Sequence, residues 1–508
     1  MNAYLTGRRY DVIKSIALFL TFVCIYFLTE RYFRSTVNAD FANSSLVWRS
    51  IHDNGFANTL KDWRPTPDSW YFSVYPVHFL LFWITQSDGP GVLTFATAVF
   101  SFLVAYGFFK IAEINSGVVP AILLTFSIAF MPEIMYTHGF IAHPFAHYST
   151  NAYGVLALLI FSININKRSV WLSIISAAIM FIAISSDMWV APSYLIPIIL
   201  TEMLILLKNR KGFSHVTIYA IAFVVGYLHI LPVALGIEKQ SMLPVSLDGM
   251  LDNIEMLVKV LGQTLNIFLV QEQWAWYASI LIWVIVICVV SVNAIKSRNQ
   301  KSYIVIALLL SIAGILSSYI LINNLFKIGS ARYFVNIAPC ALALCIIFAT
   351  GLVRKISCII ALMFIVTSIN SYSSGKINDH TKFDSLQRYI SFLDSHDLSY
   401  GYGEFWHNSM EINWVSGGRI IIIPAAGNAD HGINAVYARP QTLRHWYAKS
   451  FQEKSPKRQF IAFSTGYVCP DKEECMRKAK ESYGTPDEVL NYEFITLFVY
   501  NHRLKFYR

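Results

Sequence analysis

The chain is dominated by apolar runs that recur from Ile13 to about Tyr372. A bilayer core about 30 Å thick needs roughly 20 apolar residues per spanning helix, and most of these runs approach that length. Hydrophobic residues make up 55% of the chain and charged residues 14%, and the mean hydropathy is +0.48, which lies outside the usual range of soluble proteins. The sequence therefore predicts an α-helical polytopic membrane protein.

Basic residues fall in the short segments next to these runs. They are Arg8, Arg9, Lys14, Lys110, Lys167, Arg168, Lys208, Arg210, Lys211, Lys296, Arg298, Lys301, Arg354 and Lys355. This is the positive-inside pattern of membrane proteins, so it explains the formal net charge of +9 by topology. No basic cluster accompanies a soluble binding fold, and we expect no nucleic-acid partner.

Placing each basic loop in the cytoplasm predicts the membrane topology. It gives spans near 13–29, 92–110, 118–136, 151–166, 169–186, 190–207, 215–235, 274–295, 302–322, 333–352 and 356–372. An odd number of spans puts the C-terminal region outside. Segment 70–84 is also apolar, but counting it as a span would reverse every later loop. Its many aromatic rings favour a re-entrant or interfacial segment.

Two domains follow from this topology. Residues 1–372 form the transmembrane domain, with a first external loop at 30–91, and residues 373–508 form an outer soluble domain of mixed α/β composition. Within this outer domain, Cys469 and Cys475 predict a disulfide in an oxidising compartment. A zinc site is the alternative, but two thiols without a nearby His leave it two ligands short.

The first external loop gathers carboxylates and aromatic rings beside the membrane. Asp40 follows the first span by about three helical turns, and Asp62, Asp68 and Trp70 come later in the loop. Such carboxylates can take a proton from an acceptor hydroxyl, and aromatic faces can stack on sugar rings. The alternative is a solvated loop whose acids cap helices and turns.

This arrangement, with an early acidic residue in a long outer loop, many later spans and an outer C-terminal domain, resembles the GT-C glycosyltransferase superfamily. The resemblance covers the whole chain in architecture and implies that Asp40 is the catalytic base. Asp68, or alternatively Asp62, is the expected second carboxylate. Within the superfamily the chain is similar to bacterial O-antigen-modifying enzymes, including serotype-converting glucosyltransferases.

The resemblance also implies partners and a location. We expect an undecaprenyl-phosphate-linked sugar as donor and a glycan such as O-antigen or lipopolysaccharide as acceptor. The protein would be a hexosyltransferase of the bacterial inner membrane, with its active site and C-terminal domain in the periplasm.

A lipid-phosphate donor needs cations at the membrane surface. Lys327 and Arg332, followed by Tyr333, lie in the predicted outer loop 323–332 and at the start of the next span, as exceptions to the positive-inside pattern. We expect them to bind the donor phosphate, as the late-loop phosphate site of GT-C enzymes implies. An Arg that snorkels to lipid headgroups is the alternative.

Further candidates for sugar or acceptor binding lie in other outer segments. They are Trp70, His143, His147, Asp187, Glu404 and Trp406. His143 and His147 are four residues apart, which could also suit a metal, but Pro144 lies between them and no acidic partner completes the motif. Asp187 is equally suited to cap a helix, and Glu404 and Trp406 to lie in a domain core.

Other functions also suit a polytopic chain. A polyprenyl-linked glycan transporter or flippase would carry charges at the midplane of its spans, whereas here the carboxylates gather at the outer ends. An O-antigen polymerase or ligase shares the lipid-linked substrates. We find no Gly-rich phosphate loop or Asp-x-Asp motif, so no nucleotide cofactor is expected. No metal-binding residues are predicted, and assistance by a divalent cation stays open.

Overall fold

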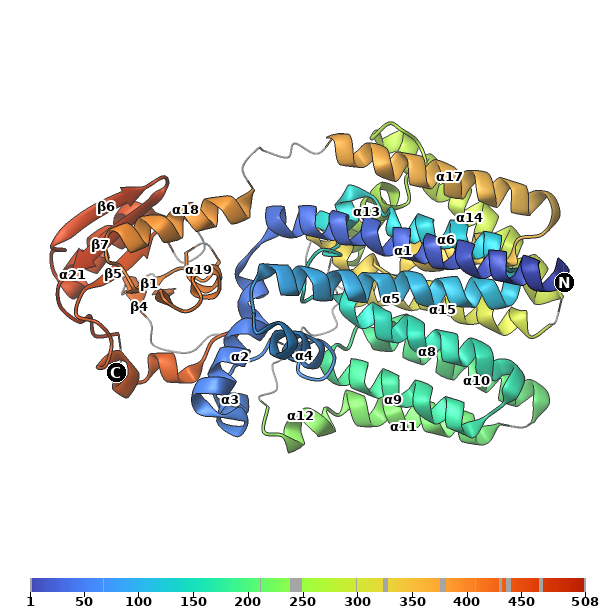
Figure 1. Ribbon diagram of the computed structural model, residues 1–508, viewed down its shortest axis with the longest axis horizontal. Helices are drawn as coiled ribbons and strands as arrows, with labels where there is room; N and C mark the ends of the chain where they lie inside the picture. Colours follow the sequence, from blue (N-terminus) through green and yellow to red (C-terminus); the bar gives the residue numbers. More distant parts are fainter. Residues whose placement is uncertain are drawn as a thin grey trace.

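The computed structural model describes residues 2–66, 68–210, 212–237, 249–297, 299–322, 328–374, 381–406, 408–428, 432–434, 440–465 and 469–506. Most helices run along the long axis of the molecule, and the C-terminal sheet lies at the end of the bundle opposite the N-terminus (Figure 1). The protein is thus a multi-pass helical membrane protein with a small C-terminal sheet domain.

An apolar helix lies at each of the eleven predicted spans. They are α1 (Asn2–Thr36), α5 (Pro90–Ser116), α6 (Val118–Ala129), α8 (His147–Lys167), α9 (Val170–Ser186), α10 (Ile196–Asn209), α11 (Phe213–Tyr227), α14 (Gln273–Lys296), α15 (Lys301–Ile322), α16 (Ile337–Phe348) and α17 (Gly351–Ser374). Within the described part of the chain, seven helical segments are long and apolar enough to cross a membrane, including α10 extended by the π-helical turn η2 (Ala191–Leu195).

Helices α6, α9, α11 and α16 are shorter than a full crossing, and local sequence explains two of them. Helix α6 ends at Ala129, three residues before Pro132, which cannot continue a helix. Helix α11 ends at Tyr227 because His229 adopts a left-handed conformation with φ 51°, and α12 (Ile230–Ala234) follows. These breaks leave irregular backbone between α6 and α8 and after α11.

Close packing fixes helix α8, which carries His147 at its first residue. A Cβ atom at Gly107 of α5 would lie 2.5 Å from Val155 Cγ1 of α8. A Cβ atom at Gly154 of α8 would lie 2.2 Å from Tyr194 Cδ2. Small residues at these positions allow the helix backbones to approach, as is common in membrane bundles.

The outer segments are short helices. The first loop contains the 3-10 turn η1 (Ala39–Ala42), α2 (Asn43–Asn54), α3 (Phe56–Asp62) and α4 (Tyr75–Thr85), and later loops contain α7 (Glu133–Thr137), α13 (Met250–Thr264) and the 3-10 turn η3 (Ile328–Phe334). Helix α4 falls on the predicted interfacial segment 70–84. Its 11 residues span only about 16 Å, half of a bilayer core.

The C-terminal domain is built on a five-stranded mixed sheet of order β2-β1-β5-β7-β6. Its strands are β1 (Tyr400–Gly403), β2 (Ile421–Pro424), β5 (Gln459–Phe463), β6 (Glu488–Tyr492) and β7 (Ile495–Tyr500), with a separate hairpin of β3 (Ala426–Asn428) and β4 (Gly432–Asn434). The helices are α18 (Lys382–Ser395), α19 (Met410–Val415), the 3-10 turn η4 (Arg444–Tyr447), α20 (Lys449–Gln452) and α21 (Lys472–Tyr483). Cys469 and Cys475 form a disulfide at the start of α21.

Arg49 is one of the residues that link the sheet domain to the segment between α1 and α5. Arg49 of α2 donates to the backbone oxygens of Asn413 at 2.9 Å and Trp414 at 3.0 Å. The same guanidinium pairs with Asp88 at 2.6 Å, and the indole of Trp414 donates to the Asp88 backbone oxygen at 3.0 Å. Helix α19 is therefore held against the outer end of the bundle, next to η1.

Candidate functional site

Asp40 lies in a 3-10 turn just beyond the first helix. The side chain of Asn38 caps this turn by accepting a hydrogen bond from the Asp40 backbone N–H at 2.9 Å, which fixes the chain as it leaves α1. The Asp40 carboxylate accepts a hydrogen bond from the side-chain amide of Gln441, 2.5 Å from Nε2 to Oδ1. A residue of the C-terminal domain thus contacts the carboxylate that the sequence singles out.

A second group of polar side chains, which we call the Asp187 cluster, comprises Asp68, His147, Thr150, Asp187 and Arg332. Asp187 follows α9 and is 1% exposed. Its Oδ2 accepts from the Thr150 hydroxyl at 2.6 Å and lies 2.8 Å from His147 Nδ1, and its Oδ1 accepts from the Trp189 backbone N–H at 2.9 Å. The ends of α8 and α9 therefore share a fully bonded buried carboxylate.

The two carboxyl groups of this cluster, Asp187 and Asp68, differ in pKa because their surroundings differ. Burial alone would raise the pKa of Asp187, but the charge of His147 and the hydrogen bonds from His147, Thr150 and Trp189 lower it. For Asp68, burial and the negative charge of Asp187 raise the pKa and the charges of His147 and Arg332 lower it, so that the pKa lies at about 6. Asp187 is thus held ionised, while Asp68 gains and loses a proton near neutral pH.

Arg332 lies in η3 and joins the cluster through aromatic rings. Its Nη2 donates to the Tyr333 hydroxyl at 3.0 Å, and its Cζ lies 5.0 Å from the Tyr333 ring centroid and 5.9 Å from that of Phe140. The Tyr333 ring in turn lies 5.1 Å from the His147 ring. The Arg332 Nε atom is buried without a hydrogen-bond partner among the described residues, so one N–H of the guanidinium lacks an acceptor there. Lys327 lies outside the described residues.

The loop between α7 and α8 lies between Asp40 and the Asp187 cluster. The His143 ring lies 4.4 Å from the ring of Phe41, the neighbour of Asp40, and 5.2 Å from that of Phe140. Phe140 has φ 58°, which is uncommon for a bulky residue and marks a constrained backbone beside Arg332.

The two predicted ligand-binding histidines, His143 and His147, have different environments. His143 Nδ1 accepts from the Phe145 backbone N–H at 3.0 Å, and burial, aided by the charge of Arg332, lowers the pKa of His143 to about 3. His143 is therefore neutral. His147 begins α8 whereas His143 precedes it, so the two do not share a helix face. Among the described residues, no group of three or more His, Cys, Asp or Glu side chains lies where it could hold a metal ion.

The remaining predicted sugar-binding residues are distributed around these two groups. Trp70 is 6% exposed and packs on Phe145, with 6.2 Å between ring centroids. In the C-terminal domain Glu404 is 5% exposed and accepts from the Ser464 hydroxyl at 3.4 Å, whereas Trp406 is 37% exposed. Of these three, the Trp406 indole offers the most surface to a ligand.

Two residues near Asp40 had no predicted role. No sequence motif around Gln441 indicates a functional role. Glu411 of α19 is buried, and its Oε2 has no hydrogen-bond partner. Burial, with smaller contributions from the charges of Asp40 and Glu404, raises the pKa of Glu411 to about 8. The C-terminal domain thus brings an uncharged carboxylic acid close to Asp40 at neutral pH.

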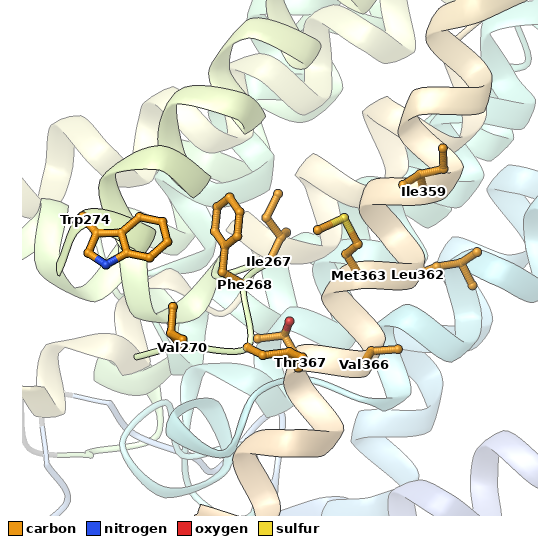
Figure 2. A pocket seen from close by; sticks show the side chains of 10 residues that line it. Ile267, Phe268, Val270, Trp274, Ile359, Leu362, Met363, Val366 and Thr367 are labelled. Carbon is orange, nitrogen blue, oxygen red and sulfur yellow. The ribbon is translucent and has the colours of Figure 1, made fainter. Parts of the chain in front are cut away.

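A pocket of about 560 Å³ lies elsewhere, between α17 and the segment that precedes α14. Figure 2 shows Met363 of α17 pointing toward Ile267 and Phe268, with Trp274, at the start of α14, beyond Phe268. The described residues that line it include no ionisable side chain. It can hold hydrocarbon, but it cannot supply acid or base chemistry.

Solved structures with a similar course of the chain are oligosaccharyltransferases of Archaeoglobus fulgidus. The enzyme in complex with Zn and sulfate aligns at a TM-score of 0.49 and 14% identity, over 96% of this chain and 73% of that one. The enzyme AglB in complex with an inhibitory peptide and a dolichol-phosphate aligns at 0.47 and 13%, over 92% and 72%.

No protein-family model matches the chain, and no characterised protein matches it by sequence. At TM-scores below 0.5 and identities of 14% or less, the structural similarities assign no activity.

Proposed function

We propose that the chain is a GT-C-type glycosyltransferase that moves a hexose from a polyprenyl-phosphate donor to a glycan acceptor on the outer face of the membrane. One observation carries the proposal. A carboxylate, Asp40, and a guanidinium with an unpaired buried N–H, Arg332, flank the same loop at the outer end of the bundle. The first suits a base and the second suits a phosphate leaving group.

The reaction follows from these two groups. The Asp40 carboxylate removes the proton from an acceptor hydroxyl, whose oxygen forms a bond to the anomeric carbon of the donor sugar. The bond between that carbon and the phosphate oxygen breaks, and polyprenyl phosphate leaves with the electron pair. Arg332 stabilises the negative charge that develops on the phosphate. Attack from the face opposite the leaving group inverts the anomeric configuration.

The donor and acceptor belong to the same proposal. We infer an undecaprenyl-phosphate donor carrying glucose, and O-antigen or lipopolysaccharide as acceptor, in the bacterial inner membrane with the site facing the periplasm. Asp68 is the proposed second carboxylate, and Tyr333 and Lys327 the remaining donor-binding residues. Trp406 lies on the C-terminal domain with 37% of its surface exposed, which suits stacking on an acceptor sugar.

Purified protein in liposomes tests the proposal directly. Undecaprenyl-phosphate-linked glucose, mannose, galactose and aminoarabinose are supplied in parallel with lipopolysaccharide, and both released undecaprenyl phosphate and sugar-modified glycan are measured. We expect one of the three hexose donors to be consumed, with equal amounts of both products; consumption of the aminoarabinose donor alone would contradict a hexosyltransferase. The matched control is Glu473→Gln, which changes an exposed carboxylate of α21 far along the sequence from the site.

Two outcomes would overturn the proposal in favour of other functions. Consumption of pyrophosphate-linked oligosaccharide, with none of the monophosphate donors used, would indicate a polymerase or ligase. Movement of the intact donor across the bilayer without release of undecaprenyl phosphate would indicate a flippase.

A further inference from the structure

A segment of the C-terminal domain binds the first external loop next to Asp40. Arg64 donates its backbone N–H to the Thr442 oxygen at 3.0 Å, and Gln441 donates its own to the Arg64 oxygen at 2.5 Å. Trp63 and Leu443 form an antiparallel bridge between the same segments. This short ladder sets the register between two parts of the chain that are almost 400 residues apart.

Asp62 extends the ladder by one further residue. Its Oδ1 accepts from the His445 backbone N–H at 2.9 Å, and its Oδ2 lies 2.5 Å from His445 Nδ1. The segment is thus fixed on both sides of Leu443. This pairing fixes the register of Gln441 against the segment that contains Asp62 and Arg64.

Gln441 itself has an unusual backbone conformation. Its φ is 66°, in the left-handed region that non-glycine residues rarely adopt, and the residue is 5% exposed. Such a conformation persists when the surrounding structure over-determines it, and it is common at functional sites. Here the ladder supplies that constraint, and the side chain reaches Asp40 with 2.5 Å between Nε2 and Oδ1.

An amide suits the task of orienting a carboxylate. Its N–H₂ group donates a hydrogen bond but does not ionise near neutral pH. It can therefore hold the carboxylate in place without competing for the proton that Asp40 would accept. Misplacement of a reacting group by about 1 Å can cost about 100-fold in rate.

We propose that Gln441 is a positioning residue for Asp40, so that the C-terminal domain completes the reaction site of the transmembrane domain. The inference rests on the proposed role of Asp40 as the base. The left-handed backbone conformation of Gln441 directs its amide to the Asp40 carboxylate, which accounts for the strain at this residue.

Two variants separate positioning from folding. Gln441→Ala removes the amide and keeps the strain, whereas Gln441→Gly removes the amide and relieves the strain. For transfer by the full-length protein, we expect kcat to fall about 10- to 100-fold in both variants, with the KM for the donor unchanged. If Gln441 were merely structural, Gln441→Gly would retain wild-type kcat and Gln441→Ala would lose thermal stability instead; that result would overturn the proposal.

A double-variant cycle with Asp40→Asn separates the positioning role of Gln441 from the proposed role of Asp40 as the base. If Gln441 acts through Asp40, Gln441→Ala lowers the residual rate of the Asp40→Asn protein by less than twofold. A full additional loss in that background would show that Gln441 acts elsewhere. An Asp40→Asn protein with wild-type kcat would instead contradict the proposed function, whatever Gln441→Ala does.

Discussion

The Nδ1 atom of His147 lies 2.8 Å from Oδ2 of Asp187, although the two residues are 40 positions apart. An ionised carboxylate can only accept, so the hydrogen bond places a proton on Nδ1. The imidazole also stacks on Trp189, with 5.5 Å between ring centroids. Asp187 therefore holds a proton on His147 Nδ1 and sets the orientation of the ring.

Asp187→Asn should slow transfer about 10- to 100-fold, because one or two charge-assisted hydrogen bonds of about 1.5–3 kcal/mol each are weakened and the His147 proton is no longer fixed. Thr150→Val removes a single hydrogen bond to the same oxygen and is the matched control, with an expected loss below tenfold. Initial rates at saturating donor provide the measurement. Equal losses in the two variants would refute the orienting role of Asp187.

Arg332→Ala should raise the KM for the donor about 10- to 100-fold, because the phosphate loses a charge-assisted hydrogen-bond partner. Arg332→Lys should recover only part of the affinity, since an ammonium group lacks the planar fork of a guanidinium. Tyr333→Phe removes the hydroxyl that Arg332 contacts and retains the ring, so its effect should be smaller. A donor KM unaffected by Arg332→Ala would exclude phosphate binding at this residue.

Glu411 predicts a pH dependence of stability. Its pKa is raised from 4.5 to about 8 in the folded protein, so the folded state holds a proton that the unfolded state releases. The contribution to stability is therefore fully present below pH 4.5 and is lost as pH rises through about 8, at up to about 1.4 kcal/mol per pH unit. Glu411→Gln cannot titrate and should flatten this slope.

Unfolding of the detergent-solubilised protein between pH 5 and pH 8 measures that difference. Glu473→Gln, at an exposed position of α21, should leave the slope as it is in the wild-type protein. A wild-type slope in the Glu411→Gln protein would show that Glu411 is not the group responsible.

The predicted topology can be tested at two positions. Cysteine introduced at Lys110 should be labelled only from the cytoplasmic side, and cysteine at Ser373 only from the periplasmic side. Both positions lie near the C-terminal ends of their helices, α5 and α17, and these two ends contact opposite ends of α1. The five native cysteines outside the disulfide are replaced first. Labelling of both positions from one side would refute the proposed orientation.

The spans could be predicted from sequence because lipid demands long apolar helices, whereas their ends could not. Helix α1 was predicted to end near residue 29 but continues to Thr36, since Glu30 and Arg34 pair at 2.8 Å and extend the helix beyond its apolar run. Helix continuation does not need apolar residues, so hydropathy does not mark it.

Individual residues of the site could be predicted from the sequence, but the contacts between them could not. Asp40, Asp187 and Arg332 stood out because each is charged beside a predicted span. Their partners did not, because contacts such as that between Gln441 and Asp40 depend on how the sheet domain docks, and no local pattern encodes that. Gln441 lies in an unremarkable loop sequence, and its left-handed backbone is visible only in three dimensions.

The most direct test of the central claim is the rate of sugar transfer by Asp40→Asn protein, measured with the donor that the wild-type protein consumes. The substitution keeps the size of the side chain and an oxygen that can accept from Gln441, so folding and donor binding should be retained. We predict that kcat falls at least about 100-fold, while thermal stability and the donor KM stay near wild-type values. Wild-type kcat in a correctly folded Asp40→Asn protein would contradict the account.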